Sequence, residues 1–174
     1  YPLDLEHTYI YCLEQMYVCS AGVMLVSCVL ITHLPMKAEL RRHTGLRGKP
    51  CLITASSSGS ARILDFSSHV KNVPVGMPLH EAMSRSPSAT LVEADAMYYQ
   101  GVFDEIVEAL LQTSPLVESS ELGRAYVGVN GLEAMYGGES RLVTALLNAI
   151  PSGFGPRIGL AKSKFPAYIA AVKS

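Results

Sequence analysis

The sequence predicts a mixed α/β or α+β fold in which a sheet carries helices on one face. Short apolar runs rich in β-branched residues alternate with helical patterns along the chain, and no segment repeats. Apolar residues make up 49% of the 174 residues and charged residues only 17%, a composition typical of an ordered globular protein. The length allows one or two small domains with a real core.

Residues 1–24 match no recognisable pattern, and we interpret them as an extension of unknown role, with Met24 a candidate natural start. The stretch from Tyr17 to Ile31 is almost uncharged, but it is shorter than the about 20 apolar residues that a membrane span needs. Acidic residues precede it where a signal peptide would carry basic ones. We therefore expect neither a membrane span nor a signal peptide.

The first half of the chain predicts three strands and a helix. Val26 to Ile31 is a continuous apolar run, as in a strand that is covered on both faces. Met36 to Arg42 follows a proline, which favours the first turn of a helix. Pro50 to Thr54 predicts a second strand and Arg62 to Phe66 a third, while the Ser-rich segment Ala55 to Ser60 between them is predicted to be a flexible loop.

The second half is dominated by helical patterns. Asp95 to Leu111 is the clearest helix, because its apolar residues recur at helical spacing and Asp95 suits the N-cap. A turn at Val75 to Pro78 leads into a shorter helix over Leu79 to Ser84. The remaining expected elements are a strand over Tyr126–Val129, a helix over Glu139–Ile150, a strand over Pro156–Leu160 and a helix over Phe165–Val172.

Global charge gives no reason to expect nucleic-acid binding, since the net charge is −1. Locally, however, one segment is basic and another, between residues 93 and 108, is acidic. These segments could be two solvated faces, or the basic one could face phosphates. The basic residues are Lys37, Arg41, Arg42, Arg47 and Lys49.

The cysteines, at positions 12, 19, 28 and 51, form no Cys-x-x-Cys pair and have no histidine at zinc-ligand spacing. They are typical of reduced, mostly buried thiols in a cytoplasmic protein. The chain also lacks Gly-x-Ser-x-Gly, Walker-type and His-Glu-x-x-His motifs, which excludes the enzyme classes that those motifs mark.

Five separated segments carry a family resemblance. They are Leu46–Pro50 (Leu-Arg-Gly-Lys-Pro), Val75–Pro78 (Val-Gly-Met-Pro), Tyr98–Phe103, Val117–Val129 and Gly159–Ala170. In the same order and at matching spacing, they resemble segments of the Y-family (UmuC/DinB-like) translesion DNA polymerases. The resemblance runs from about Val26 to the end of the chain and implies a polymerase-type palm, formed by 25–42 and 95–174, with a small fingers insertion at 43–94. Thumb and little-finger domains have no counterpart in this chain.

The resemblance also implies where the catalytic carboxylates should stand. The family's Asp-x-Asp falls on Leu30 and Thr32, and its Asp-Glu pair falls on Gly123 and Arg124. Phosphoryl transfer by two metal ions needs hard oxygen ligands, and Mg²⁺ takes carboxylates for preference. None of the four positions carries a carboxylate, and Arg124 would repel a cation. The sequence therefore predicts no catalytic residues, no bound metal and no cofactor.

The nucleotide-binding segment is altered as well. The family's Tyr-Glu-Ala-Arg falls on Phe66 to His69, and His69 cannot grip phosphate bidentately as arginine can. The ribose-sensing aromatic pair falls on Leu34 and Pro35. Lys164 matches the family's triphosphate-contacting lysine. Lys164, Phe66 and His69 thus remain the candidates for contacting a nucleotide or phosphate.

Three acidic residues nearby are the candidates to replace the missing ligands. Glu118 matches a glutamate that accompanies the intact motif, which implies a structural role, and Glu39 lies in the first helix. Glu121 is two residues before Gly123, so a strand would keep it on the same face. One carboxylate there could hold at most one weakly bound metal.

The chain is therefore similar to the inactive polymerase-like subunits of the ImuB type, which bridge a sliding clamp and an error-prone polymerase in the SOS response. This predicts a noncatalytic, cytoplasmic scaffold in DNA repair that binds primed or damaged DNA weakly through the basic segment and Lys164. Clamp and polymerase contacts would come from regions outside this chain. One alternative is a divergent Mg²⁺-dependent nucleotidyltransferase using Glu118 or Glu121, and another is a protein-interaction module that binds no DNA.

Overall fold

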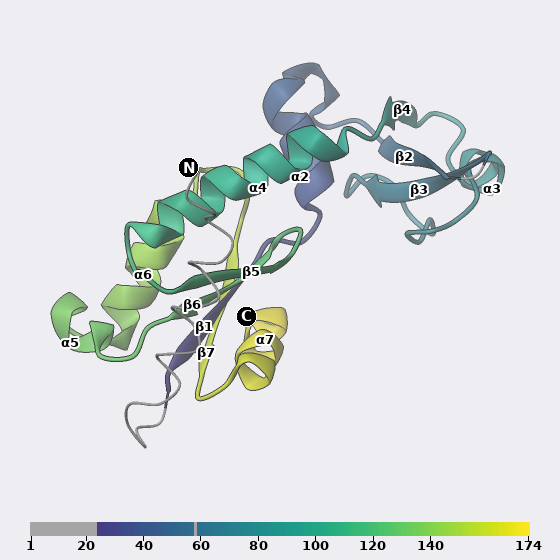
Figure 1. The fold of residues 1–174 in the computed structure, drawn as a ribbon. Helices are drawn as coiled ribbons and strands as arrows, with labels where there is room; N and C mark the ends of the chain where they lie inside the picture. Colours follow the sequence, from purple (N-terminus) through teal and green to yellow (C-terminus); the bar gives the residue numbers. More distant parts are fainter. Residues whose placement is uncertain (1–23, 58) are drawn as a thin grey trace, which may run out of the picture.

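The computed structural model describes residues 24–57 and 59–174, so the extension before Met24, with Cys12 and Cys19, lies outside the described residues. The described chain forms a four-stranded sheet of order β5-β6-β1-β7 and a three-stranded sheet of order β3-β2-β4, joined by helices (Figure 1). The mixed α/β class is thereby confirmed. Of the helices in these residues, none is both long and apolar enough for a membrane span.

The four-stranded sheet is built around β1 (Val26–Leu30), which pairs antiparallel with β6 (Arg124–Gly128) on one side and β7 (Arg157–Ala161) on the other. Strand β5 (Val117–Glu121) forms one edge and joins β6 through a tight hairpin. Because β1 has neighbours on both sides and helices on both faces, its continuous apolar run is needed along its whole length.

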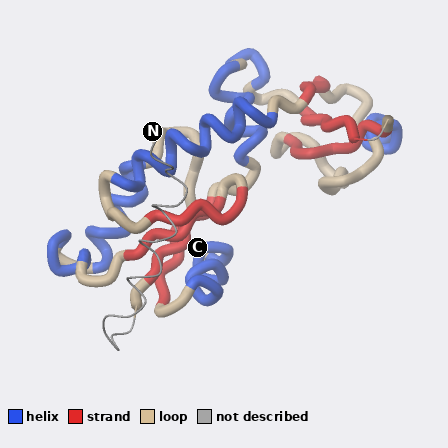
Figure 2. The backbone as a smooth tube through the Cα atoms, viewed as in Figure 1, coloured by secondary structure: helices blue, strands red, loops and turns tan. Residues whose placement is uncertain are grey.

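Helices cover both faces of this sheet (Figures 1 and 2). Helices α4 (Ala96–Leu111) and α6 (Glu139–Ala149) pack their buried residues against one face, as expected. Helix α7 (Lys164–Lys173) lies against the opposite face, which corrects the expectation of helices on one face only. Gly159 permits this close approach, since a Cβ atom there would lie 2.1 Å from the backbone oxygen of Ala167. The short helix α5 (Leu132–Tyr136) precedes α6.

The smaller sheet lies within residues 43–94 and comprises β2 (Cys51–Ser57), β3 (Ser60–Phe66) and β4 (Thr90–Glu93), with helix α3 (Leu79–Arg85) beside it. The prediction of a flexible loop over Ala55–Ser60 is wrong. Residues 54 to 57 pair with residues 60 to 63, so the strands of this hairpin continue almost to its tip. Composition alone missed this because cross-strand hydrogen bonds satisfy a Ser-rich backbone as well as any other.

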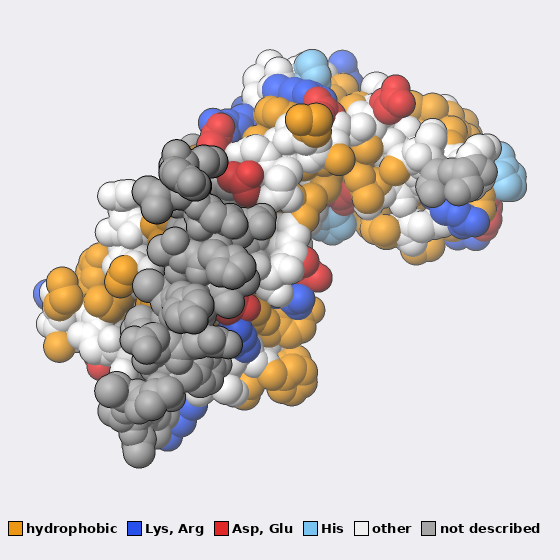
Figure 3. Space-filling model, in the orientation of Figure 1, with side chains coloured by type: hydrophobic (Ala, Val, Ile, Leu, Met, Phe, Trp, Pro, Cys, Tyr) orange, Lys and Arg blue, Asp and Glu red, His pale blue; other side chains and the backbone are white. Residues whose placement is uncertain are grey.

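We call residues 25–42 and 95–174 the palm-like part and residues 43–94 the fingers-like part. In the space-filling view the fingers-like part projects from the palm-like part (Figure 3). The two parts nevertheless share a core, because Cys51 and Ile53 of β2 belong to the buried cluster formed by β1, α4 and α6. A separate, smaller cluster around Leu52 and Ile63 lies within the fingers-like part.

Helix α2 (Leu34–Arg42) connects the parts, followed by a 3-10 turn over Thr44–Leu46, and it is fixed to α4 by a buried charge. The Glu39 carboxylate is fully buried and accepts hydrogen bonds from Arg42, at 2.7 and 3.0 Å, and from the Tyr99 hydroxyl, at 2.7 Å. Arg42 also pairs with Asp95 at 2.9 Å and lies over the ring of Tyr98. The hydrogen bond from Arg42 lowers the pKa of Asp95. Tyr99 and Phe103 are core residues.

Replacing Arg42 by alanine should lower the free energy of unfolding by about 3–5 kcal/mol, because the buried Glu39 carboxylate would lose its counter-ion. The matched control is Arg41→Ala on the next residue, whose exposed pair with Glu105 is worth less than about 1 kcal/mol. Urea denaturation measures both variants. Equal losses of stability would contradict the role that we assign to the buried carboxylate.

The buried Tyr99 hydroxyl should make the fold labile to alkali. Burial, and then the hydrogen bond to Glu39, raises the pKa of Tyr99. A raised pKa in the folded state contributes stability that is complete below the unfolded value of about 10 and declines as the pH rises beyond it. Urea denaturation between pH 8 and pH 11 should therefore show a steeper loss of stability for the wild type than for Tyr99→Phe. Parallel curves would argue against this assignment.

Candidate functional site

The four positions predicted for catalytic carboxylates lie together, at the end of β1 and at the β5–β6 hairpin. Leu30 is the direct cross-strand partner of Arg124 on one side and of Arg157 on the other. Its side chain packs partly buried in the small apolar cluster under α7, which contains Cys28. Thr32 follows β1 and is half-buried. These positions thus lie close together, and their side chains are apolar, hydroxyl or basic rather than acidic.

Arg124 is held in place on this face by two neighbours. Its guanidinium lies 3.2 Å from the Glu121 carboxylate and 4.8 Å from the centre of the Tyr168 ring on α7. Its Nε atom is buried and has no hydrogen-bond partner among the described residues. A cation–π contact and an ion pair together stabilise a positive charge at this place.

Lys164, at the start of α7, forms the second cationic group of this site. Its ammonium lies 2.5 Å from the Glu118 carboxylate and 5.6 Å from the centre of the Tyr126 ring. Burial raises the pKa of Tyr126, while the charges of Arg124 and Lys164 act to lower it. Burial likewise raises the pKa of Cys28, against the lowering effect of Arg124. These shifts indicate that Arg124, Lys164 and Glu121 act electrostatically on one small region around Tyr126.

Gly123 adopts a backbone conformation that leaves no room for a side chain. Its φ angle is +87°, and its carbonyl oxygen accepts a 2.7 Å hydrogen bond from the backbone N–H of Ile31. A Cβ atom at this position would lie 2.6 Å from the backbone oxygen of Ile31. The hairpin therefore excludes an aspartate sterically as well as lacking one in sequence.

The donor set does not fit a pair of magnesium ions. Glu118 and Glu121 are the acidic side chains beside the hairpin, and each already pairs with a side-chain cation. Within residues 24–57 and 59–174, no three His, Cys, Asp or Glu side chains come close enough together to hold a metal ion. Mg²⁺ needs several oxygen ligands in octahedral geometry, which this arrangement does not supply.

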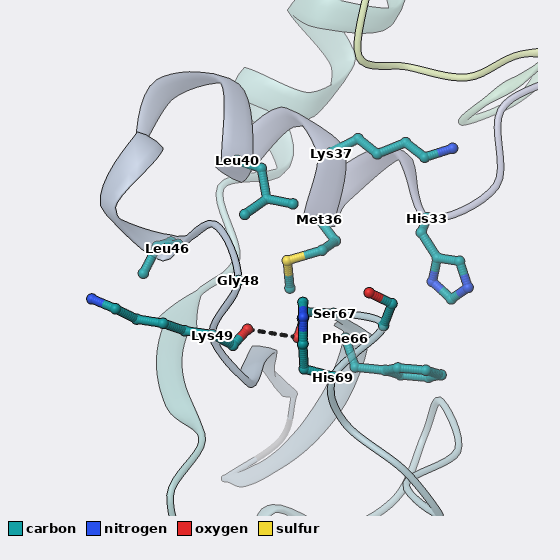
Figure 4. A pocket seen from close by; sticks show the side chains of 11 residues that line it. His33, Met36, Lys37, Leu40, Leu46, Gly48, Lys49, Phe66, Ser67 and His69 are labelled. Carbon is teal, nitrogen blue, oxygen red and sulfur yellow. Dashed lines mark hydrogen bonds between the residues drawn. The ribbon is translucent and has the colours of Figure 1, made fainter.

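A separate pocket of ≈ 240 Å³ lies where the two parts of the molecule meet (Figure 4). Met36 and Leu40 of α2, Leu46 and Phe66 give it apolar walls. Two of the predicted nucleotide-contact residues, Phe66 and His69, line this pocket. Two lysines of the basic segment, Lys37 and Lys49, line it as well. Both lysine side chains extend away from its middle (Figure 4). Lys164 does not line it, so the three nucleotide-contact candidates do not converge there.

Most of the basic segment is engaged within the molecule. Lys37 donates a 2.7 Å hydrogen bond to the carbonyl of Phe154, and burial together with Arg157 lowers its pKa despite the opposing effect of Asp65. Arg41 and Arg42 pair with carboxylates, as described above. Arg47 makes only a long hydrogen bond, 3.4 Å, to a backbone oxygen, and Lys49 forms no ion pair with any described residue.

Sequence reasoning missed one buried charged residue beside the pocket, Asp65. Its carboxylate is almost fully buried and contacts His33 and the start of α2. A signal was present, because alternation along β3 places Asp65 on the same face as the fully buried Ile63. An acidic residue on the buried face of a strand needs hydrogen-bond donors or a counter-ion, so this position predicts a polar contact.

The palm-like sheet, the inserted smaller sheet and the altered hairpin point to a polymerase-type chain. Residues 31–172 match the model of the IMS: impB/mucB/samB family, and the chain belongs to that family. The resemblance to Y-family polymerases that the sequence segments carry is thereby confirmed.

Curated relatives have the same character. The DNA polymerase IV of Clostridium kluyveri is 22% identical over 141 residues, which are 78% of this chain and 35% of that protein. The DNA polymerase IV of Desulfatibacillum aliphaticivorans is 28% identical over 151 residues, which are 82% of this chain and 38% of that protein. This chain therefore spans less than two fifths of the length of these relatives.

Solved structures show the same fold. The crystal structure of DinB from Sulfolobus solfataricus has a TM-score of 0.74 at 23% identity, over 87% of this chain and 46% of that one. The insertion ternary complex of Dbh DNA polymerase has a TM-score of 0.79 at 23% identity, with the same coverage. At this level of identity, the likeness concerns the arrangement of the chain and not its activity.

Gly123→Ala should destabilise the fold more than a glycine replacement that tests backbone strain alone. Gly76 is the matched control, because its φ angle is +84° and no atom lies within 4 Å of a Cβ built there. We expect Gly76→Ala to cost about 1–2 kcal/mol for the left-handed conformation and Gly123→Ala a further ~1–3 kcal/mol for the collision with Ile31. Chemical denaturation gives both values, and similar losses would mean that the hairpin can relax.

Proposed function

We propose that this chain is a noncatalytic member of its family that acts as a DNA-associated scaffold or accessory subunit in translesion synthesis. The observation that carries the proposal is the state of the metal-ligand positions. Leu30, Thr32, Gly123 and Arg124 supply no carboxylate, and the guanidinium of Arg124 is fixed there by Glu121 and Tyr168. Two-metal phosphoryl transfer has no ligands to work with at such a site.

Residual activity through Glu118 or Glu121 would require the ion pair of that glutamate to open. A divalent ion would have to displace Lys164 from Glu118 or Arg124 from Glu121. The displaced ammonium or guanidinium group would then stand close to the incoming metal and repel it. We therefore favour the scaffold over a divergent nucleotidyltransferase.

DNA is the proposed ligand because several similar solved structures are described as binary or ternary polymerase complexes. In this chain the proposed backbone contacts are Arg47 and Lys49, the two members of the basic segment whose charges no carboxylate offsets in the described structure. Contacts to phosphate need only positive charge and give binding that weakens with salt. A sliding clamp and an error-prone polymerase are proposed partners of the whole protein, which we place in the cytoplasm with the chromosome.

The proposal predicts no templated primer extension with Mg²⁺ or Mn²⁺. It also predicts binding of fluorescent primed DNA in EDTA, weakening as the salt concentration rises. Replacing both Arg47 and Lys49 by glutamine should reduce the slope of log affinity against log salt by up to about 2, because two phosphate contacts would be lost. The matched control is Arg41→Gln together with Arg85→Gln, since both of these arginines already pair with carboxylates.

Two outcomes would contradict the proposal. Templated extension that Glu121→Ala abolishes would establish the nucleotidyltransferase alternative. Binding that is absent, or indifferent to salt, would favour a protein-interaction module without DNA contacts.

A further inference from the structure

The start of α2 is occupied by an anion that the chain itself supplies. The Asp65 carboxylate lies on β3 in the fingers-like part, only 4% exposed. It accepts hydrogen bonds from the backbone N–H of Met36 at 2.9 Å and of Phe66 at 2.8 Å, and His33 Nδ1 lies 2.5 Å away. His33 and Met36 belong to the palm-like part, so one carboxylate joins the two parts of the molecule.

The sequence of α2 explains why a distant carboxylate binds there. Helix N-termini expose unpaired N–H groups and favour negative charge. The N-cap residue is His33, which makes no side-chain capping bond, and Pro35 has no N–H to donate. Met36 therefore presents the free N–H that a cap would normally take in the first turn, and Asp65 takes it from 29 residues away.

His33 adds a strained conformation to this contact. Its φ angle is +54°, in the left-handed region that non-glycine residues adopt rarely, and its ring meets that of Phe66 edge-on at 5.1 Å. A conformation of this kind persists where surrounding contacts hold it. Here the carboxylate and the Phe66 ring, both from the fingers-like part, are those contacts.

The same carboxylate lies directly behind the wall of the pocket in Figure 4, although Asp65 does not itself line the pocket. Its three hydrogen-bond donors, His33, Met36 and Phe66, all line that pocket. Lys37 is near enough for Asp65 to raise its pKa against the larger effect of burial, so the local cation is also partly offset. A phosphate entering beside Phe66 and His69 would meet a buried negative charge where a helix N-terminus would otherwise attract it.

We propose that Asp65 is an internal anion that fills the anion site at the start of α2, excludes phosphate from the pocket lined by Phe66 and His69, and fixes the fingers-like part to the palm-like part. The residue thereby sets the ligand specificity of the pocket. This inference does not depend on whether the chain binds DNA. Lys49 lines the pocket as well, but the inference rests on the contacts of Asp65 and not on the charges of Arg47 and Lys49.

Removing the carboxylate should create polyphosphate binding. With EDTA present, isothermal titration of tripolyphosphate should give no measurable heat with the wild-type chain and at least tenfold tighter binding with Asp65→Ala. Asp65→Asn, which keeps the shape and removes the charge, should show a smaller gain. The control is Asp104→Asn, an exposed carboxylate on α4 whose loss changes the net charge equally. Adding His69→Ala to Asp65→Ala should reverse the gain and locate the bound anion.

Hydrogen exchange of the wild-type chain gives an independent measurement. The backbone N–H groups of Met36 and Phe66 should exchange at least tenfold more slowly in the wild type than in Asp65→Asn, and this holds even if Asp65→Ala fails to fold. Wild-type binding of tripolyphosphate as tight as that of the Asp65 variants would overturn the proposal. So would rapid exchange of the Met36 amide in the wild type, or a gain of binding that Asp104→Asn reproduces.

Discussion

The positive charge of Arg124, held on the sheet by Glu121 and by the ring of Tyr168, is the constraint around which this site is arranged. A palm that works with metals gathers carboxylates and depends on divalent ions to offset their mutual repulsion. This chain has a cation at the centre and carboxylates beside it, so the charges balance without an added ion. Lys164 and Glu118 form a second pair of this kind beside it, again a cation offset by a neighbouring carboxylate.

Residues of this region that differ from the family motifs contact one another. Gly159–Ala170 resembles the family motif Gly-Ile-Ala-x-Asn-Lys-Phe-Leu-Ala-Lys-x-Ala, in which lysine stands at the position of Tyr168. The resemblance likewise implies a glutamate at the position of Arg124. Arg124 on β6 and Tyr168 on α7 contact each other in this structure, so an aromatic ring stands where the motif has a cation, next to the new cation. Leu30 stands at another of the positions where the family has an acid, and it packs against the underside of α7. Arg124 and Lys164 each pair with a carboxylate, so this packed surface offsets much of its own charge without a metal ion.

The sequence alone was sufficient for elements that carry a strong local signal. The apolar run of β1 and the helical spacing of α4 with its Asp95 cap were predicted within a residue or two. The edge strands β4 and β5 were missed, since half-exposed strands have too little apolar content to stand out. Asp65 is a different case. Alternation along β3 indicates that it is buried, but its partners lie 29 and 32 residues away and no local pattern identifies them.

The hairpin and the pocket each carry a charge opposite to the one that a nucleotide site needs. The hairpin has a cation where carboxylates would hold metals, and the N-terminus of α2 has a carboxylate where a phosphate would bind. In a nucleotide site, the cations and the phosphates stabilise each other. Metal ions and lysines attract the phosphates, and the phosphates in turn offset the repulsion among the cations. Here Arg124 and Lys164 have internal carboxylates as counter-ions, and the N-terminus of α2 has Asp65. Restoring only the carboxylates would leave an anion at the phosphate position and a Gly123 backbone that cannot accept a side chain. Under the proposed noncatalytic function, a return of catalysis would therefore demand simultaneous changes in both parts of the molecule.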